Sequence, residues 1–432
     1  MTTVVHARWI LPMTIDGERL EHAAIAFDQH ILDVLPSDLA RDRFPRARHI
    51  TLDHHVLLPG FVNAHTHAAM SLLRGAGSDC ALQTWLEQHI WPLEGRLLSE
   101  AFVRDGTQLA IAEMLRSGTT TFADMYLFPE AAADAIEAAG IRAVLTAPVI
   151  DFPTPYARSL TDYLARARAL AERLCDHPML TAGLGPHAPY TVGDASLAAV
   201  LELASDADLA IQMHVHETQA EIDRALAETG ERPITRLARL GAFTRPFQAV
   251  HMTALDQDDI VRVVEHGVRV VHCVESNLKL ASGFCPVAKL TRAGVAVALG
   301  TDGAASNNDL DLLGEARTAA LVAKAVAGDA TVLSAYDTLA LMTREGARVL
   351  GLDETVGTLE AGMQADLIAI DLDCIETWPE HDPAAAILYA SNRNQIKHVW
   401  VAGRHLLEDR LLTSIDEDAL RATAQRWAET RA

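Results

Sequence analysis

Two patterns of apolar residues alternate along most of the chain. Short runs rich in β-branched residues are followed by longer stretches in which apolar residues recur at helical spacing. Because short apolar runs suit buried strands and longer periodic stretches suit amphipathic helices, the pattern predicts a series of strand–helix units. The predicted strands cover residues 58–64, 119–124, 141–147, 180–185, 209–214, 247–251, 268–272 and 295–301.

The stretches between these strands are rich in Ala and Leu and predict helices. Eight strands with helical crossovers indicate an α/β fold, a (β/α)8 TIM-type barrel, which we place at residues 58–361. The helical stretches cover residues 99–117, 130–139, 160–174, 194–204, 218–228 and 256–266.

Both ends of the chain carry strand-like segments outside the predicted barrel. Examples are "TTVVHARWIL" near the start and "QIKHVWVAGRHLLE" near the end. The most economical arrangement joins the two ends in one domain. We therefore expect a small β-sandwich domain made of residues 1–57 and 362–432.

Composition and charge narrow the class of protein. Of the 432 residues, 50% are hydrophobic, which suffices for a large core. The formal net charge is −22, from 36 basic and 58 acidic residues, and a field of this sign disfavours nucleic acid and anionic membranes as partners. No uninterrupted apolar run is long enough to cross a bilayer.

The cysteines and the first residues bear on location. The five cysteines are scattered and form no C-x-x-C pair, which indicates reduced thiols. The first residues lack the basic segment and the long apolar stretch of a signal peptide. We therefore expect a cytoplasmic protein.

Polar residues stand at or directly after nearly all the predicted strand ends. One histidine alone could be an ordinary hydrogen-bonded residue of the core or of a loop. A (β/α)8 barrel, however, carries its active site at the C-terminal ends of its strands, so the gathering of five histidines there predicts a functional site. The residues are His65, Asp124, His187, His214, His251, His272 and Asp302.

The segment "FVNAHTHAAM" places His65 and His67 two positions apart at the end of the first predicted strand. Side chains at positions i and i+2 of a strand point to the same side, so both imidazoles can bind one metal ion. A third imidazole can come from His214 or His216, and Asp302 can supply a carboxylate. Three imidazoles and a carboxylate with an open water position describe a catalytic zinc or iron site.

Several segments together resemble one known family. They are "PGFVNAHTHAAMSLLRG", "PHAPY", "HVHET", "SNLKLASG", "LGTDGAASNN" and "GTLEAGMQADLIAID", in this order along the chain. With them the sequence resembles the amidohydrolase superfamily, and within it the 5-methylthioadenosine/S-adenosylhomocysteine deaminases, over nearly its whole length. The resemblance implies metal-dependent hydrolytic deamination of an adenosine-type nucleoside to the inosine analogue plus ammonia. It also implies a homo-oligomer.

The family pattern H-x-x-E bears on the metal ligands. It assigns His214 to the metal and Glu217 to proton transfer, and it leaves His216 with a structural role. Some members of the superfamily hold two metals bridged by a carboxylated lysine on the fourth strand. We expect one divalent metal per chain, Zn²⁺ or alternatively Fe²⁺, because no lysine lies in the first half of the barrel. The lysines are Lys279, Lys289, Lys324 and Lys397.

The resemblance also implies catalytic roles. A divalent metal such as zinc lowers the pKa of its bound water from ~15.7 to about 7, and this water would attack C6 of an adenine ring. Glu217 would take a proton from the water and deliver it to N1. Asp302 and His251 would hold the water and help to protonate the departing ammonia.

Three further residues match substrate contacts of the family. Glu94 in "WPLEGRL" corresponds to a carboxylate that accepts ribose hydroxyls, and its alternative is a solvated helix residue. His187 corresponds to a histidine that contacts the base, and Ser306 to a further pocket residue. His272 receives no role, because "HCVESN" departs from the family pattern.

The segment "VLTAPVIDFPTPYARSL" bears on the 5′ group of the nucleoside. Relatives that process S-adenosylhomocysteine place arginines here to hold its carboxylate. Ala147 stands where one such arginine would be, and Arg158 lies near the second position. We expect neutral 5′ groups to be handled at least as well as S-adenosylhomocysteine, unless Arg158, Arg142 or Arg74 binds the carboxylate.

Two alternatives stay open. A deaminase or dechlorinase of the same branch could act on a guanine, pterin or triazine ring, but it would not need Glu94 as a ribose anchor. A barrel that has lost catalysis could serve as an assembly scaffold. Retention of all four predicted ligands and of Glu217 disfavours the scaffold.

Overall fold

The computed structural model describes residues 1–431, and they form two compact units. Ala432, the last residue of the predicted β domain, lies outside the described residues. The unit called here the sheet unit comprises residues 1–63, 112–121 and 311–416, and the barrel unit comprises residues 64–111, 122–310 and the segment from Glu417 on. The domain boundaries at 57/58 and 361/362 stay a prediction.

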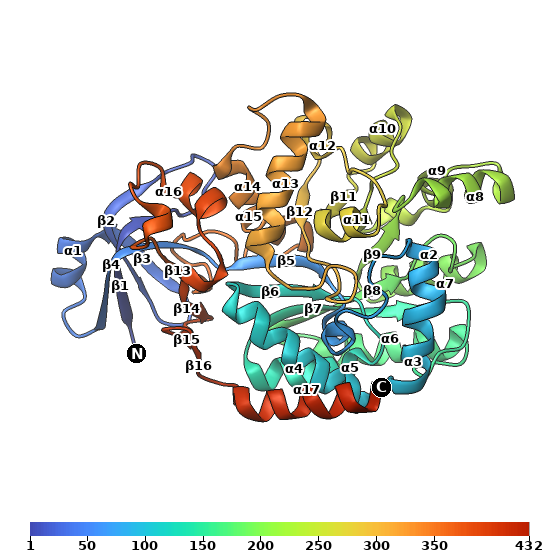
Figure 1. Cartoon of the computed structure of the whole chain (residues 1–432), viewed down its shortest axis with the longest axis horizontal. Coiled ribbons are helices and arrows are strands. Elements are labelled where there is room, and N and C mark those ends of the chain that lie inside the picture. Colours follow the sequence, from blue (N-terminus) through green and yellow to red (C-terminus); the bar gives the residue numbers. More distant parts are fainter. Residues whose placement is uncertain (432) are drawn as a thin grey trace. The chain divides into compact units, whose positions relative to one another are not determined.

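Eight strands of one sheet follow each other in chain order, from β5 to β12 (Figure 1). The pairs from β7 to β12 are parallel, and an isolated parallel bridge joins Thr66 to Asp302, so the first strand meets the segment after the last. The predicted (β/α)8 barrel is confirmed. The strands are β5 (Phe61–Thr66), β6 (Thr119–Asp124), β7 (Arg142–Val149), β8 (Leu180–Pro186), β9 (Ala210–Val215), β10 (Phe247–His251), β11 (Arg269–His272) and β12 (Val297–Leu299).

The first barrel strand begins three residues later than the sequence predicted. Residues 58 and 59 belong instead to the end of β4, a strand of the second sheet, and Gly60 lies between the two strands. A Cβ atom at Gly60 would lie 2.1 Å from Oγ1 of Thr120, so only glycine allows this close approach of the backbone. The switch between sheets therefore sits at a residue that cannot carry a side chain.

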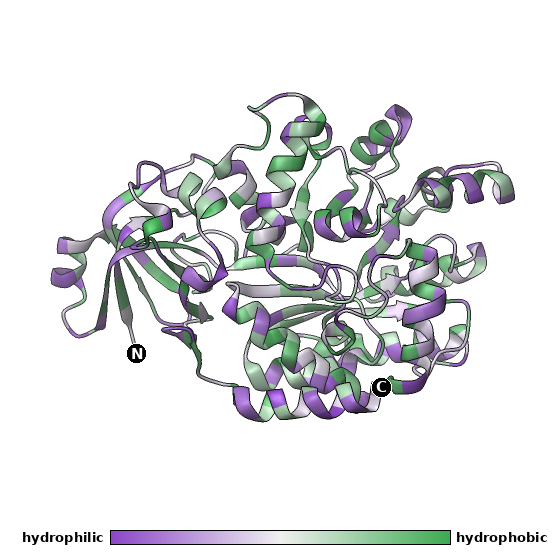
Figure 2. Cartoon of the chain, in the orientation of Figure 1, coloured by the Kyte–Doolittle hydropathy of each residue, from purple (hydrophilic) through white to green (hydrophobic). Residues whose placement is uncertain are grey.

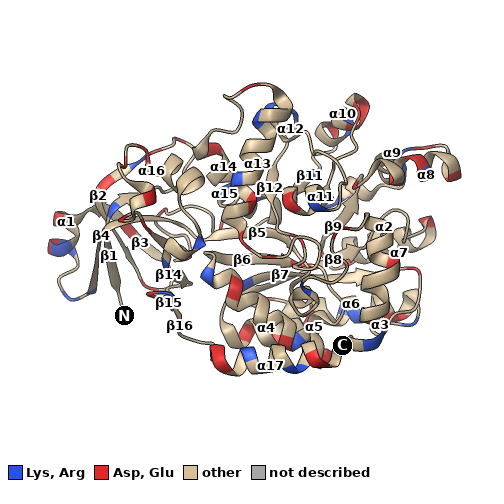
Figure 3. Cartoon of the chain, in the orientation of Figure 1, with Lys and Arg blue, Asp and Glu red and all other residues tan. Residues whose placement is uncertain are grey.

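Helices connect the barrel strands, and their ends lie within two residues of the predicted ones where a helix was predicted. Local sequence explains several ends: Ser159 caps α6 by accepting from the Asp162 amide, and Asp256 forms a capping box at α10. Charged residues lie mostly on helices such as α8, α10 and α17 and are rare on the barrel strands (Figure 3). The helices that connect the barrel strands are α4 (Glu100–Arg116), α5 (Pro129–Ala139), α6 (Leu160–Leu174), α7 (Asp194–Asp206), α8 (Gln219–Thr229), α9 (Pro233–Arg239), η3 (Ala242–Thr244), α10 (Gln257–Glu265), α11 (Val274–Lys279) and α12 (Val287–Arg292). Helix α17 (Glu417–Arg431) follows the last strand of the chain and connects none of them.

A helical segment that the sequence did not predict separates β5 from α4. It consists of η1 (Ala68–Leu73), α2 (Leu82–Trp85), the π-helix η2 (Leu86–Ile90) and α3 (Trp91–Leu97). Trp85 and Ile90 of this segment are buried. The segment contributes one wall of the cavity described below.

The second sheet joins the two ends of the chain, which confirms the predicted β domain. Its order is β16-β15-β14-β13-β4-β1-β2-β3, and β4 pairs with β13 through Leu58 and Ile368. The strands of this sheet are mainly hydrophobic (Figure 2) and bury Phe27 and Trp400. They are β1 (Thr3–Ile10), β2 (Leu20–Phe27), β3 (Ile31–Pro36), β4 (Arg48–Pro59), β13 (Leu367–Asp371), β14 (Ile396–Val401), β15 (Arg404–Glu408) and β16 (Leu411–Leu412).

The sheet unit also contains helices for which the sequence pattern gave no expectation. They are α1 (Ser37–Arg43), α13 (Leu312–Ala327), α14 (Ala335–Leu341), α15 (Arg344–Leu350), η4 (Ile375–Thr377), α16 (Pro383–Ala385), η5 (Ala386–Ala390) and η6 (Arg393–Gln395). Across residues 1–431, no helix combines the length and the apolar character that crossing a bilayer requires.

Candidate active site

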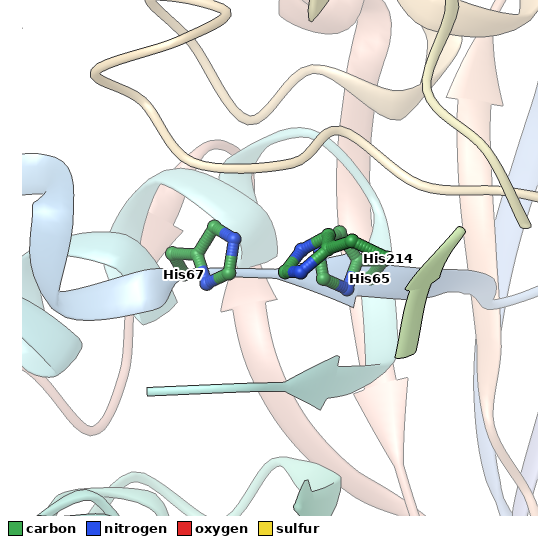
Figure 4. A group of neighbouring side chains, drawn as sticks. All are labelled: His65, His67 and His214. Atoms are coloured by element: carbon green, nitrogen blue, oxygen red, sulfur yellow. The ribbon is translucent and has the colours of Figure 1, made fainter. Parts of the chain in front are cut away.

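Three imidazoles meet at one end of the barrel strands. His65 lies in β5, His67 directly follows this strand, and His214 lies in β9. One ring nitrogen of each lies within 4.8 Å of the others, and Figure 4 shows the three side chains grouped together. The i, i+2 spacing and two strand ends thus bring three potential metal ligands to one point.

Hydrogen bonds fix which nitrogen of each ring faces this point. The Nδ1 atom of His67 donates to the Met125 carbonyl at 2.5 Å, and that of His214 donates to the His187 carbonyl at 2.8 Å. The Nδ1 atom of His65 lies 2.7 Å from Oε1 of Gln212, whose amide group donates elsewhere. In the neutral form of each ring the proton therefore lies on Nδ1, and Nε2 presents a lone pair, as metal-binding histidines do.

This arrangement fits a cation. The Nε2 atoms of His65 and His214 are 3.2 Å apart, and in the tautomers above two lone pairs face each other with no proton between them. An Oδ1 atom of Asp302 lies 3.2 Å from Nε2 of His67 and 3.6 Å from Nε2 of His65. Three imidazole nitrogens and one carboxylate form a donor set that suits a divalent metal ion.

Charge supports the same conclusion. Burial alone would raise the pKa of Asp302, but His65 and His67 hold this pKa well below its usual range. Burial would lower the pKa of His67, yet Asp302 raises it to about 9. Ser276 Oγ and the Gly303 amide donate to the same carboxylate at 2.6 and 2.8 Å. The group therefore holds an ionised carboxylate that is stabilised by positive charge beside it, which a protonated His67 or a bound cation can supply.

A second buried carboxylate, Glu217, follows β9. Burial raises its pKa to about 8, with Asp302 adding to the effect and His67 opposing it. Its Oε1 atom lies 3.8 Å from Nε2 of His251, whose Nδ1 lies 2.9 Å from Oδ1 of Asn277. A carboxyl group with such a pKa can gain and lose a proton near neutral pH, as a general acid–base requires.

The backbone around these residues is unusual. Positive φ angles occur at His216 (54°), His251 (77°), Met252 (51°) and Asp302 (60°), all near the ends of barrel strands. Such angles cost energy in residues other than glycine, and they persist where the surrounding structure imposes them. Their clustering here marks the strand ends as the functional end of the barrel.

A cavity opens over this group, and apolar and polar side chains both line it, as in sites for small organic ligands. Eight predicted site residues line it: His67, Glu94, His187, His214, Glu217, His251, Asp302 and Ser306. His65 is fully buried and does not line it. The predicted site residues are thus brought together around one cavity and the metal-binding group beside it.

Glu94 belongs to α3 and shares a hydrogen bond with a residue that follows β6. The Tyr126 hydroxyl donates to its Oε1 atom at 2.6 Å. Burial raises the pKa of Glu94, and the bond from Tyr126 opposes that effect. The carboxylate is therefore a cavity residue and not a solvated one.

Three residues considered in the sequence lie off the cavity. His216 lies near Ala254, with Nδ1 3.2 Å from its carbonyl oxygen, and Nε2 accepts from the Ile234 amide at 3.1 Å. Burial lowers the pKa of His272 to about 3, and this residue does not line the cavity. Arg158 is exposed.

Sequence reasoning missed four residues that hold the site in place. Gln212 lies two positions before His214 on the same strand, so strand periodicity could have pointed to it. Asn277, Tyr126 and Glu221 carry no such signal, because their roles depend on contacts between distant segments. Glu221 accepts from the amides of His216 and Glu217 at 3.2 and 2.7 Å.

Comparison with known proteins agrees with this geometry. The model of the amidohydrolase family matches residues 56–406. A 5-methylthioadenosine/S-adenosylhomocysteine deaminase of Teredinibacter turnerae is 45% identical over 425 residues, which are 98% of this chain and 96% of that protein. A deaminase of the same name from Saccharophagus degradans is 43% identical, over 98% of this chain and 95% of its own.

A solved structure is also similar along nearly the whole chain. The crystal structure of an adenosine deaminase from Xanthomonas campestris with bound zinc has a TM-score of 0.98 and 46% sequence identity. The alignment covers 99% of this chain and 98% of that one.

Proposed function

The chain belongs to the amidohydrolase family, and we infer that it catalyses the hydrolytic deamination of adenosine-type nucleosides to the inosine analogue and ammonia. The observation that carries this inference is one cavity lined by a metal-binding group, a buried carboxylate with a raised pKa and a second carboxylate for a sugar. Deaminases that are 43–46% identical over almost the full chain support it.

We propose one divalent metal per chain, held by His65, His67, His214 and Asp302, with zinc as the first choice and Fe²⁺ as the alternative. Zinc in the structure of the Xanthomonas relative supports this choice. Such a metal lowers the pKa of water toward neutrality and so supplies a nucleophile for attack on C6 of the purine.

Glu217 and His251 would move the protons. Glu217, with its pKa near 8, would take a proton from the water and deliver it to N1 as the nucleophile adds to C6. The Nδ1 atom of His251 is directed at Asn277, so Nε2 faces Glu217, and His251 together with Asp302 would hold the water and help to protonate the departing ammonia. His187 and Ser306 would contact the base, and Glu94 would accept the ribose hydroxyls. Guanine, pterin and triazine rings would leave Glu94 without a function.

The 5′ end of the nucleoside would meet an apolar wall. Among the described residues that line the cavity, none is a lysine or an arginine. Arg142 is the first residue of β7, at the other end of the barrel, and donates to the Pro178 carbonyl. Neutral 5′ groups therefore suit this cavity better than the charged end of S-adenosylhomocysteine. The wall includes Leu82, Trp85, Ile90, Trp91, Leu127 and Ile150.

Ammonia release from a panel of substrates tests the function and its 5′ preference together. The panel holds adenosine, 5-methylthioadenosine, S-adenosylhomocysteine, guanine and an amino-substituted triazine, each of which carries a ring amino group that hydrolysis would release as ammonia. We expect the neutral nucleosides to match or exceed S-adenosylhomocysteine in kcat/KM, because one missing charge-assisted bond is worth about one to two powers of ten. A preference of more than about tenfold for S-adenosylhomocysteine would contradict the 5′ assignment. Faster release from guanine or the triazine would contradict the function.

Replacement of Glu217 by Gln tests its role in proton transfer. The variant should keep its metal and its substrate affinity but lose a factor of roughly 10² to 10⁴ in kcat. Glu228→Gln is the control, because Glu228 is an exposed residue of α8 that pairs with Arg224. Near-normal turnover of the Glu217 variant would transfer the role to another group, with His251 the first to test.

The remaining expectations on location and assembly stay proposals. We propose a cytoplasmic protein, since no disulfide joins the cysteines of the described chain. We also propose a homo-oligomer, a small-molecule nucleoside as the partner of the cavity, and no nucleic acid or membrane as a partner.

A further inference from the structure

We propose that Tyr126 is a positioning residue that holds Glu94 in place for the ribose hydroxyls and so determines the preference for ribonucleosides. The inference rests on the proposed function. Its basis is the bond from the Tyr126 hydroxyl to Oε1 of Glu94, 2.6 Å long, between two side chains that both line the cavity.

The bond from Tyr126 leaves the second carboxylate oxygen of Glu94 free to accept hydrogen bonds from a ligand. An ionised carboxylate offers about four lone-pair positions on two oxygens, and the tyrosine hydroxyl uses one of them. The other oxygen, Oε2, can then accept from the 2′ and 3′ hydroxyls of a ribose. A glutamate side chain has several rotatable bonds, so a donor that fixes it removes an ordering cost from substrate binding. Burial also disfavours the charged carboxylate, and the tyrosine hydroxyl stabilises it.

Tyr126 itself is tied to the metal-binding group. The preceding residue, Met125, accepts from Nδ1 of His67 at 2.5 Å and donates its amide to the Thr66 carbonyl at 3.0 Å. Asp124 accepts from the Thr66 hydroxyl and from the Ala68 amide at 3.0 and 2.7 Å. The three residues from 124 to 126 therefore position both a metal ligand and the sugar-binding carboxylate.

The test is Tyr126→Phe, which removes only the hydroxyl group, with adenosine and 2′,3′-dideoxyadenosine as substrates. Loss of a bond to a charged group should lower kcat/KM for adenosine by roughly 10- to 100-fold, mainly through KM. The dideoxy substrate has no hydroxyl for Glu94, so its kcat/KM should change less than about twofold by the same reasoning. Metal content should equal that of the unsubstituted protein.

Tyr156→Phe is the matched control. Its hydroxyl also donates to a glutamate, Glu130, at 3.0 Å, and its side chain is buried, but neither residue lines the cavity. The control should leave both substrates unchanged. Glu94→Gln provides a second variant: it should show the same loss on adenosine alone, and adding Tyr126→Phe to it should cost little more, because the two residues act as one unit.

Each outcome decides between supporting and overturning the inference. An equal loss on adenosine and on the dideoxy substrate in both variants would overturn it, as would an unchanged KM for adenosine in Tyr126→Phe. Additive losses in the double variant would also overturn it. If the unsubstituted protein releases no ammonia from any nucleoside while it holds its metal, the proposed function fails and this inference fails with it.

Discussion

Histidine rings gather in both units of the molecule, but they are held in opposite ways. In the barrel unit His65, His67 and His214 each direct Nδ1 at an oxygen acceptor, and their Nε2 atoms converge beside a carboxylate. In the sheet unit the rings bond to one another: Nδ1 of His398 lies 3.2 Å from Nε2 of His405.

The sheet-unit rings also stack on an aromatic side chain. The rings of Trp400 and His405 are 4.3 Å apart and nearly parallel, at 13°. His55 lies 6.0 Å from His398, and the Nδ1 atoms of His55 and His405 are buried without a hydrogen-bond partner among the described residues. Proximity of histidines alone is therefore a poor guide to a metal site. Asp409 lies 3.5 Å from Nε2 of His398, but its side chain is 80% exposed, whereas that of Asp302 is 7% exposed. The acceptor that orients each Nδ1 and the buried carboxylate beside the Nε2 atoms make the difference.

The largest effect is expected from a variant that disrupts the histidine cluster of the barrel unit and leaves that of the sheet unit intact. His65→Ala removes one of four proposed ligands, so it should lose most of the bound metal and nearly all ammonia release. His405→Ala should keep both, because its ring bonds to His398 and stacks on Trp400, and the one carboxylate near it, Glu408 at 3.8 Å, is exposed. Metal analysis and turnover of both variants make the measurement.

Two results would contradict this comparison. Full metal occupancy and full activity in His65→Ala would remove the proposed site. A reproducible second ion per chain that disappears in His405→Ala would show that the sheet-unit cluster also binds metal.

Replacement of the residue that orients His65 should have a smaller effect on metal binding. Gln212 accepts from His65 and donates to the Ala64 carbonyl and to Gln248, so Gln212→Leu should free the ring and lower metal affinity about 10- to 100-fold. Gln364→Leu is the control, since the Gln364 amide lies 3.4 Å from His30 in the sheet unit. Competition with a chelator measures the affinity. An unchanged affinity in Gln212→Leu would show that packing alone orients the ring.

Much of the fold followed from the sequence, since apolar periodicity reports burial directly. Helix α6 has the predicted ends, and β6 and β10 have the predicted bounds. Periodicity failed between residues 82 and 97, where a π-helix lies between two short helices and interrupts the regular spacing. It also gave no expectation for α13, α14 and α15.

The candidate site was predictable to the extent that strand ends share one end of a barrel. That rule brought His65, His214 and Asp302 together but could not separate His214 from His216. The structure supplies the physical reason, because a positive φ at His216 turns its ring toward the Ile234 amide. The sequence gives no signal for Tyr126 and Asn277, because each acts only through a hydrogen bond to a residue on a distant segment.

The smallest expected effect concerns pH and the sheet unit. Burial, with a contribution from His398, lowers the pKa of His405 from 6.5 to about 4. The unfolded chain therefore binds a proton at this residue at higher pH than the folded chain does. Stability that is full above pH 6.5 is lost progressively as the pH falls toward 4.

Replacement of His405 by Phe removes this titration and keeps a ring against Trp400. Between pH 7.5 and 5, His405→Phe should lose about 1 kcal/mol less unfolding free energy than the unsubstituted protein, after allowance for partial solvent screening. Urea unfolding at the two pH values measures the difference.

Loss of a bound metal from the barrel at acidic pH would affect both proteins alike. The difference between their unfolding free energies therefore reports on the sheet unit. His22→Gln, at an exposed position of the same unit, is the control for the loss of a sheet-unit histidine. Equal pH dependence in His405→Phe and the unsubstituted protein would mean that the sheet-unit rings accept protons in the folded state as easily as in the unfolded chain. The contrast with the barrel cluster would then lie in ligand geometry alone.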